Sequence, residues 1–326
     1  MPLTRDLADS VVVITGGSGG IGAATALRLA GRGAAVVVGA RREHALADVV
    51  AACRARGGRA LGLRTDVTDP AAVEALGRRA VEEFGRVDAW VNNAAVVSYG
   101  TFTETPIDEF RRVIETNLLG VGYGTRTAIS HLRATGGGVV VNVASVLGEV
   151  TVPYLSGYVA AKQGVRALSG TVRQELRLAG ERDISVCVLL PASIDTPMYR
   201  HAANHTGARI APIPPVYAPD VAARRIVQLL EHPRREAHAG PAGAFLAWQW
   251  RLAPGLLERV MAAYTHRTAL RAEPVRPTSG TVFAPGDDPS STDDGWRRRP
   301  WVVARLARLG AAGARLALAG WRHARG

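Results

Sequence analysis

The chain has 326 residues, 47% of them hydrophobic and 21% charged, so it is long enough to bury a sizeable core in one or two domains. Its formal net charge is +12, but residues 296–326 contribute eight arginines and no acidic residue, which leaves 32 basic and 28 acidic residues elsewhere. This near balance argues against a nucleic-acid-binding core. Two distant cysteines, and no basic N-terminal segment followed by a long apolar one, predict a cytoplasmic protein without a disulfide framework.

Six short runs, most of them rich in valine and isoleucine, alternate with longer helical patterns between residues 11 and 239. The runs are almost wholly apolar, which is typical of strands that helices cover on both faces. Among the expected helices, residues 69–85 have a clear N-terminal signal, because Asp69 is a good N-cap and Pro70 suits the first helical position. The alternation predicts an α/β fold: a doubly wound, Rossmann-like parallel sheet with helices on both faces. The expected strands are residues 11–15, 34–40, 59–66, 87–93, 138–145 and 184–191.

The sequence pattern changes after about residue 240, so residues 1–240 are assigned to one α/β domain. The motifs described next lie in this domain, which is therefore expected to bind the cofactor and to carry the catalytic residues. Residues 241–271 are typical of a helical extension with a break at Pro254–Gly255, and we expect them to form a lid over the substrate. Residues 272–300 are rich in proline, glycine and aspartate, the composition of an extended or disordered linker. Residues 301–326 are expected to form a basic amphipathic helix.

The first expected strand runs directly into TGGSGGIG, residues 15–22, which opens a helix. Gly16, Gly20 and Gly22 permit a tight turn, the close approach of a pyrophosphate group and close packing of the helix on the strand. The N-terminus of the helix supplies amide donors and a favourable dipole for phosphate groups. A glycine-rich turn in this position predicts a nucleotide site.

The end of the second expected strand indicates which nucleotide binds. Sites for NAD place an acidic residue about 20 residues after the glycines, where it holds the 2′-hydroxyl of the ribose. Here Ala40 takes that place, and Arg41 and Arg42 follow it. Two guanidinium groups suit a 2′-phosphate, so we predict NADP(H) as the cofactor; the other interpretation is a solvated basic loop.

Lys162 is the only lysine among the 40 basic Lys and Arg residues. Its survival suggests a function that arginine cannot perform, because lysine is a compact ammonium with a tunable pKa whereas guanidinium is a wide planar fork. The other interpretation is the chance retention of one surface lysine. Tyr158 precedes Lys162 by four residues, so the two side chains project from the same face of a helix.

Six motifs, in order and over roughly residues 8–240, resemble those of the short-chain dehydrogenase/reductase family in its compact TGxxxGxG, YxxxK form. The resemblance implies an enzyme that transfers a hydride between a nicotinamide cofactor and a carbonyl or alcohol group, and that needs no metal. The motifs are TGGSGGIG (15–22), NNAA (92–95), TN (116–117), NVAS (142–145), YVAAK (158–162) and PASIDTP (191–197).

The resemblance also implies catalytic roles. Tyr158 would be the general acid/base, and the ammonium of Lys162 together with the positive ring of the oxidised cofactor would lower its phenol pKa, by about three units for work near neutrality. Lys162 would also bind the ribose of the nicotinamide. Ser145 would donate a hydrogen bond to the substrate carbonyl oxygen. Asn117 would hold a water that links Lys162 to solvent, unless it only satisfies backbone groups.

A further set of residues is expected around the cofactor. Asn92 and Ala94 would line its adenosine side, Asp66 would contact the adenine, and Thr196 would hold the carboxamide of the nicotinamide. His131, His201 and His205 lack the spacing of a metal site, so no metal is expected. The full set expected to bind NADP(H) is Gly16, Ser18, Gly20, Ile21, Gly22, Arg41, Arg42, Asp66, Val67, Asn92, Ala94, Tyr158, Lys162, Pro191, Ile194 and Thr196.

An NADPH-dependent carbonyl reductase, or the reverse alcohol dehydrogenase, is favoured over a non-catalytic NADP-binding regulator, because a regulator is expected to lack Tyr158, Lys162 or Ser145. The substrate is predicted to be a bulky lipophilic carbonyl compound or the corresponding alcohol, since residues 193–219, which are expected to form the substrate lid, and residues 245–264 carry many apolar side chains. The alternative is a membrane- or polyanion-docking NADP-binding protein whose catalytic role is secondary. The enzyme is expected to form homo-oligomers.

The tail combines arginines with bulky apolar residues. On a helical wheel that starts at Val302, four arginines fall within roughly one 100° arc beside an apolar stripe. This pattern is typical of a helix that lies in a membrane interface, or of one that docks on the enzyme itself or on a second subunit. We therefore expect residues 296–326 to contact anionic membranes reversibly, which would make the protein peripheral to the membrane.

Overall fold

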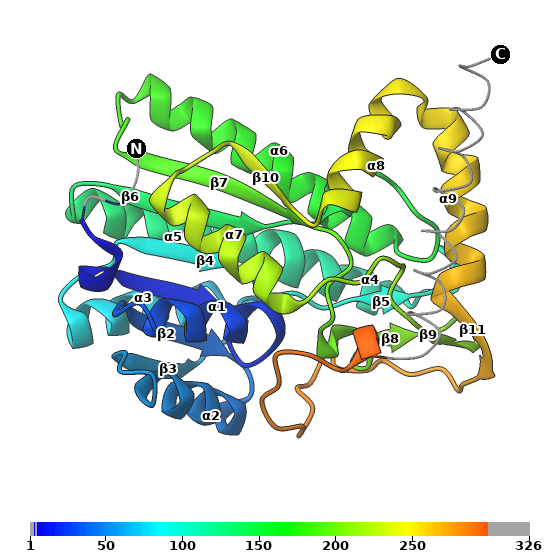
Figure 1. Cartoon of the computed structure of the whole chain (residues 1–326), viewed down its shortest axis with the longest axis horizontal. Helices are drawn as coiled ribbons and strands as arrows, with labels where there is room; N and C mark the ends of the chain where they lie inside the picture. The colour runs from blue at the N-terminus through cyan, green and yellow to red at the C-terminus, as the bar shows by residue number, and fades with distance from the viewer. Residues whose placement is uncertain (1–2, 4, 299–326) are drawn as a thin grey trace, which may run out of the picture.

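A seven-stranded parallel sheet forms the centre of the molecule (Figure 1). The computed structural model describes residue 3 and residues 5–298. The strand order is β10-β7-β6-β4-β1-β2-β3, so the direction of winding reverses between β1 and β4. In open α/β sheets, ligands bind beyond the carboxyl ends of the strands at such a reversal. The strands are β1 (Val11–Thr15), β2 (Ala35–Ala40), β3 (Ala60–Arg64), β4 (Ala89–Asn92), β6 (Gly138–Val143), β7 (Ile184–Pro191) and β10 (Glu236–Ala239).

Helices cover both faces of the sheet, which confirms the predicted doubly wound α/β fold (Figure 1). The helix α3 begins as predicted, because the carboxylate of Asp69 accepts the amide of Ala71 at 2.9 Å, and it ends at Gly85 with a φ of 80°. One face carries α1 (Gly20–Ala30), α2 (Glu43–Arg54) and α7 (Pro219–Glu231); the other carries α3 (Pro70–Phe84), α5 (Gly120–Ala134) and α6 (Ser156–Leu178), with α4 (Ile107–Ile114) packed on α6.

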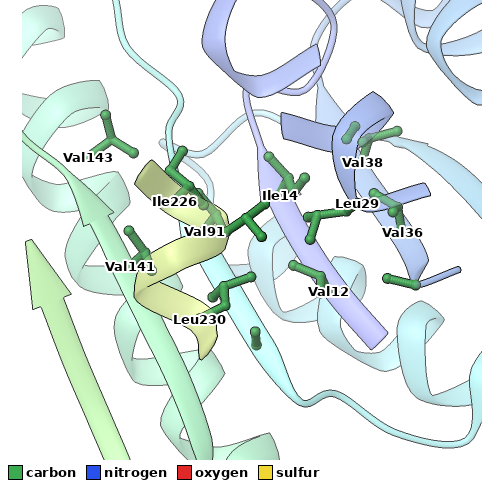
Figure 2. Close-up of a cluster of buried hydrophobic side chains, with 14 of the residues drawn as sticks. Val12, Ile14, Leu29, Val36, Val38, Val91, Val141, Val143, Ile226 and Leu230 are labelled. Atoms are coloured by element: carbon green, nitrogen blue, oxygen red, sulfur yellow. The ribbon is translucent and has the colours of Figure 1, made fainter. Parts of the chain in front are cut away.

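Alternate residues of β1 point to opposite faces of the sheet, and both sets are buried. Val12 and Ile14 pack under α1 and α7 (Figure 2), whereas Val11 and Val13 pack on the side of α3 and α5. Burying each of these side chains completely contributes about 1.5–3 kcal/mol relative to leaving it exposed. The strand is therefore held firmly in the centre of the sheet, and so is the glycine-rich turn that follows it.

Five strands escaped prediction because they are short or lie at an edge. The sequence of β10, EAHA, alternates half-buried and buried residues at the end of the sheet, so it lacks the continuous apolar run of a central strand. The other four form two small two-stranded sheets beside the main one: β5 (Ser98–Tyr99) with β8 (Ala203–Asn204), and β9 (Ala208–Ile210) with β11 (Leu270–Pro274).

The segment after residue 240 folds into two helices, as expected for a helical extension. They are α8 (Pro241–Leu252) and α9 (Pro254–Ala269), separated at Ala253, one residue before the predicted break. Among the residues that the structure describes, no helix has both the length and the apolar character needed to cross a membrane.

The prediction of an extended or disordered linker does not describe residues 272–298. This segment leaves β11, which pairs with β9, and then lies against the body of the protein, where Val282 is 1% exposed and Trp296 is 4% exposed. The composition does not distinguish a disordered linker from an ordered one, because proline, glycine and aspartate also suit a non-repetitive segment held by hydrogen bonds to other parts of the chain. The predicted basic helix of residues 301–326 lies outside the described residues.

Candidate active site

Ser145 lies just beyond the carboxyl end of β6, where a short 3-10 helix, Val146–Gly148, begins. Its hydroxyl oxygen accepts the amide of Leu147 at 3.1 Å and shares a hydrogen bond with the phenol of Tyr158. The end of the strand and the cap of the short helix together fix the direction of this hydroxyl.

Tyr158 and Lys162 come from the first two turns of α6 and project from one face of it. Both are buried, with 9% and 1% of their surface exposed. The ammonium Nζ of Lys162 donates to the carbonyl oxygen of Val143 at 2.9 Å and lies 5.4 Å from the centroid of the Tyr158 ring. Lys162 is therefore not a surface residue retained by chance.

Burial governs the titration of both side chains. It raises the pKa of Tyr158 to about 12, although the hydrogen bond with Ser145 acts in the opposite direction, and it lowers the pKa of Lys162 to about 8. The protein alone therefore does not lower the pKa of Tyr158 as the sequence suggested, because desolvation of the phenolate dominates. Tyr158 is a neutral phenol at pH 7.

Asn117 lies in a π-helical turn, Glu115–Leu119, between α4 and α5. Its buried amide pairs with the backbone of Val96 in both directions: Nδ2 donates to the carbonyl oxygen at 2.8 Å, and Oδ1 accepts the amide at 2.9 Å. The side chain thus anchors the loop after β4 and satisfies backbone groups. The π turn shifts the helical hydrogen-bond register here, and such turns often occur at functional sites. No local sequence pattern predicted it.

One cavity of about 670 Å³ joins this corner to the glycine-rich turn. Glycine keeps the passage open, because a Cβ on Gly20 would come within 3.2 Å of Thr196. A main-chain cradle at one end and buried polar groups at the other fit a nicotinamide dinucleotide. The predicted residues that line the cavity are Gly16, Ser18, Gly20, Ile21, Arg41, Arg42, Asp66, Val67, Ala94, Ser145, Tyr158, Lys162, Pro191, Ile194 and Thr196.

Three of the predicted site residues, Gly22, Asn92 and Asn117, do not line this cavity. Asn92 is turned into the protein, where it donates to Asn142 Oδ1 at 2.8 Å, and Asn93 faces the cavity instead. Side chains of adjacent extended residues point in opposite directions, so the two asparagines cannot both face the cofactor. Gly22 has a packing role, since a Cβ there would collide with the carbonyl oxygen of Gly16.

Arg41 and Arg42 line the cavity beyond the end of β2, but their guanidinium groups already have partners. Each donates to backbone carbonyl oxygens of residues 281–288, far along the chain. Residues Thr281, Pro285 and Gly286 of this segment complete the cavity wall. No periodic pattern could have revealed them; the only sequence signal is the acidic run of residues 287–294 set against the two arginines.

The other half of the cavity is largely apolar, and two expected segments meet there. Residues 193–219 contribute the 3-10 helix Pro197–Tyr199 and the prolines 214 and 215, while α8 and α9 contribute further side chains to the wall. The side chains that line this half are Val97, Tyr99, Leu147, Val152, Met198, Tyr199, Ile213, Phe245, Leu246, Met261 and Tyr264.

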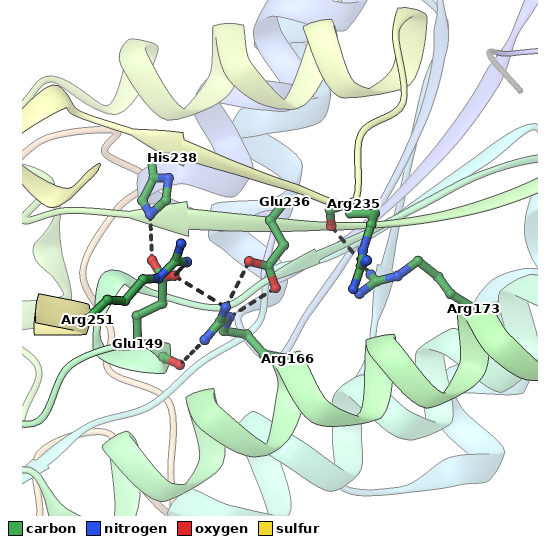
Figure 3. A network of polar contacts seen from close by, with 8 residues as sticks. Glu149, Arg166, Arg173, Arg235, Glu236, His238 and Arg251 are labelled. Atoms are coloured by element: carbon green, nitrogen blue, oxygen red, sulfur yellow. Dashed lines mark hydrogen bonds and ion pairs between the residues drawn. The ribbon is translucent and has the colours of Figure 1, made fainter. Parts of the chain in front are cut away.

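A network of charges holds the elements around this half together (Figure 3). The carboxylate of Glu149, 4% exposed, pairs with His238 of β10 at 2.6 Å, with Arg251 of α8 at 2.7 Å and with Arg166 of α6 at 3.3 Å. Arg166 also binds Glu236 at 2.8 Å. Glu149 therefore ties the loop after Ser145 to α6, to β10 at the edge of the sheet and to α8.

Replacing Glu149 by glutamine is expected to lower the free energy of unfolding at pH 7. Burial alone would raise the pKa of this carboxyl, but hydrogen bonds from His238 and Arg251 and the charge of Arg166 outweigh it and lower the pKa from 4.5 to about 2. That shift corresponds to about 3 kcal/mol of stability, present above pH 4.5 and lost as the pH falls towards 2. Urea unfolding at pH 7 and pH 3 measures both effects.

The matched control for this change is Glu181→Gln, because Glu181 pairs with Arg133 on the surface. We expect a much smaller effect from an exposed pair. If Glu149→Gln lowered the free energy of unfolding no more than Glu181→Gln does, the network around Glu149 would not stabilise the fold.

The fold and the site define a nucleotide-binding α/β oxidoreductase, and sequence comparison narrows the class. The family profile described as short chain dehydrogenase matches residues 10–206. The chain belongs to the short-chain dehydrogenase/reductase family.

Three similar proteins illustrate the relationship. An uncharacterised oxidoreductase, YxnA of Bacillus subtilis (strain 168), is 32% identical over 299 residues, which cover 90% of this chain and 84% of that protein. The cis-4-hydroxycyclohexanecarboxylate dehydrogenase of Sinomonas cyclohexanicum is 40% identical over 71% of this chain and 88% of its own length. The crystal structure of a short-chain dehydrogenase/reductase from Burkholderia phymatum in complex with NAD is 27% identical, with a TM-score of 0.69 over 83% of this chain and 98% of that one.

Proposed function

We propose that the protein is an NADP(H)-dependent oxidoreductase that interconverts a lipophilic carbonyl compound and its alcohol, with Tyr158 as general acid/base. The observation that carries the proposal is the single cavity that has Ser145, Tyr158 and Lys162 at one end and the glycine-rich turn with Arg41 at the other. A bound nicotinamide cofactor would supply or accept the hydride; the residues of the chain supply binding, orientation and the proton.

The proposed mechanism begins with Ser145, whose hydroxyl donates to the substrate carbonyl oxygen and stabilises the negative charge that develops there. The phenol of Tyr158 then gives its proton to the same oxygen. The ammonium of Lys162 stabilises the resulting phenolate and binds the nicotinamide ribose. Proton resupply would run from solvent, through a water held by a backbone carbonyl oxygen of the π turn at Asn117, to Lys162 and on to Tyr158, because the side chain of Asn117 is engaged by Val96.

The pKa of Tyr158 matches the protonation state that carbonyl reduction requires. Tyr158, with a pKa of about 12, is protonated at neutral pH and is ready to act as an acid. Alcohol oxidation requires the phenolate, which forms only when additional positive charge compensates for burial. We therefore propose the mechanism in the direction of carbonyl reduction, and alcohol oxidation is its reverse.

The apolar lining of the substrate half supports a lipophilic substrate. Aromatic and aliphatic side chains from residues 193–219, α8 and α9 surround the space next to Tyr158, so an apolar ring or chain would be desolvated there without leaving buried polar groups unpaired. The relative from Sinomonas cyclohexanicum is named for a substituted cyclohexane. A panel of cyclic ketones and of long-chain and polar aldehydes, assayed by NADPH oxidation, tests this part of the proposal.

We expect NADPH to bind at least about tenfold more tightly than NADH, because a guanidinium contact to the 2′-phosphate contributes about 1.4 kcal/mol or more. Replacing Arg41 by alanine is expected to remove most of that ratio. Isothermal titration calorimetry with both cofactors measures it. Arg64→Ala, a change of an exposed arginine at the end of β3, is the control and should keep the ratio. Equal affinities in the wild-type protein would exclude the NADP assignment.

The alternative function, docking of an NADP-binding protein on membranes or polyanions, has less support, because the complete Ser145, Tyr158 and Lys162 set has no purpose in it. Reversible contact of residues 296–326 with anionic membranes stays a prediction, and all but three of those residues lie outside the described part of the chain. A cytoplasmic location and a homo-oligomeric state likewise stay predictions.

A further inference from the structure

Residues 278–298, which we call the strap, run from the β9–β11 sheet back across the cofactor end of the cavity, and the described segment after β11 is drawn in orange in Figure 1. The first end of the strap is anchored to residues 201–204. The backbone of Thr278 pairs with that of Asn204 in both directions, at 2.7 and 3.1 Å, and the amide of Thr281 donates to the carbonyl oxygen of His201 at 2.9 Å. Val282 is buried next to this anchor.

The second end of the strap is anchored by one buried carboxylate. Asp195, 2% exposed, accepts the backbone amides of Asp294, Trp296 and Arg297 at 3.1, 3.0 and 3.1 Å. The indole of Trp296 packs edge-on against Tyr199 with 6.0 Å between the ring centroids. Both ends are therefore fixed, and the residues between them span the mouth of the nucleotide half.

The middle of the strap occupies donors that a phosphate-bearing cofactor would use. Arg41 donates to the carbonyl oxygens of Thr281 at 2.6 Å and Phe283 at 2.9 Å, and Arg42 donates to that of Asp288 at 2.9 Å. These are the two guanidinium groups that follow β2, where a 2′-phosphate binds in this kind of site.

The strap also reaches the start of α1. The amide of Gly20, the first residue of that helix, donates to the carbonyl oxygen of Ser291 at 2.9 Å. The first amides of a helix have no partner within the helix and bind anions for that reason. A backbone carbonyl from the strap thus takes a place in which the glycine-rich turn would otherwise offer a donor to a pyrophosphate oxygen.

The charge of the strap matches this position. Four aspartates lie within residues 287–294, and the carboxylate of Asp288 pairs with His201 at 2.7 Å and with Arg200 at 3.5 Å. The strap therefore brings both carbonyl oxygens and carboxylates to the basic side of the cavity, which are the features that a phosphate group would present there.

We propose that residues 284–291 of the strap compete with the cofactor for Arg42 and for the amide of Gly20, so that cofactor binding displaces this part of the strap while its two anchors stay in place. The proposal deepens the proposed function and rests on it, because it assumes a nicotinamide dinucleotide in the cavity. Gly20 has a single N–H, which cannot serve both Ser291 and a pyrophosphate oxygen. The competition is intramolecular, so only molecules with an open strap bind the cofactor. The apparent dissociation constant is therefore the intrinsic one divided by the fraction of molecules in which the strap is open.

The test is to loosen the strap without touching the cavity. Asp288→Ala removes the ion pairs to His201 and Arg200, and Asp287→Ala is the matched control, because it removes the same charge from the neighbouring exposed position. We expect Asp288→Ala to bind both NADPH and NADH about three- to tenfold more tightly than the wild-type protein, and Asp287→Ala to stay within about twofold. Isothermal titration calorimetry gives the four dissociation constants.

Hydrogen–deuterium exchange on the wild-type chain gives a second readout that needs no variant. NADPH is expected to speed exchange at the amides of residues 284–291 and to leave the amides of Asp294 and Trp296 protected. Weaker or unchanged cofactor binding in Asp288→Ala, or slower exchange in residues 284–291 when NADPH binds, would overturn the proposal, the latter because the strap would then clamp the cofactor. The NADP assignment fails separately, through equal binding of NADPH and NADH, since both carry the pyrophosphate group for which the strap competes.

Discussion

Replacing Tyr158 by phenylalanine is expected to lower kcat for carbonyl reduction by about 10²–10⁴-fold, the usual contribution of a positioned general acid. The phenol is the neutral, buried group next to Ser145, and phenylalanine keeps its ring but has no proton to give. NADPH affinity should stay within about threefold, because the glycine-rich turn and the arginines are unchanged. Steady-state kinetics and a calorimetric titration of the same preparation separate the two effects.

The control for this change is Tyr99→Phe, since Tyr99 is a second buried tyrosine that lines the same cavity. The loss of its hydroxyl should cost much less than tenfold in kcat. A Tyr158→Phe enzyme that kept more than about a tenth of the wild-type rate would contradict the assigned proton donor.

Replacing Lys162 by arginine is expected to lower kcat/KM by at least about 100-fold, a severe effect for a change that keeps the charge. Lys162 is 1% exposed, and its Nζ donates to the carbonyl oxygen of Val143 at 2.9 Å in a space shaped for one ammonium. A guanidinium is wider, carries five donors and stays charged, whereas burial lowers the pKa of Lys162 to about 8. Steady-state kinetics measures the loss, and circular dichroism shows whether the fold is kept.

Arg177→Lys is the reciprocal control, because Arg177 is an exposed residue of the same helix. It should leave kcat/KM unchanged within about twofold. If Lys162→Arg were folded and as active as this control, the survival of a single lysine in the sequence would need an explanation other than catalysis.

The central sheet could be predicted because its signal is local. Each inner strand, such as β1 or β6, is a continuous apolar run, and burial on both faces leaves few other sequences possible. The edge strand β10 could not be predicted, because two of its four residues are polar and only half-buried, so its short sequence has no distinctive pattern. The small β9–β11 sheet joins residues some 60 positions apart, a pairing that only the folded chain defines.

The candidate site divides in the same way. Tyr158 and Lys162 are four residues apart on one helix, so sequence spacing alone predicts their shared face. The prediction that Asn92 lines the cofactor site was wrong, because one position along an extended chain reverses the direction of a side chain. The partners of Arg41 come from residues 281–283, about 240 positions later, so two arginines that the sequence presents as free are in fact held by backbone carbonyl oxygens.

The burial of the one lysine gives the protein an unusual response to amine chemistry. Lys162 is the only lysine in 326 residues, and 1% of its surface is exposed. The outer surface of the folded chain therefore offers no lysine to acylating reagents. An acyl group can reach Lys162 only through the cavity that this residue lines. The amount of adduct at this residue, followed by mass spectrometry over time, would therefore report access to the cavity without any engineered probe, and a bound cofactor is expected to slow it.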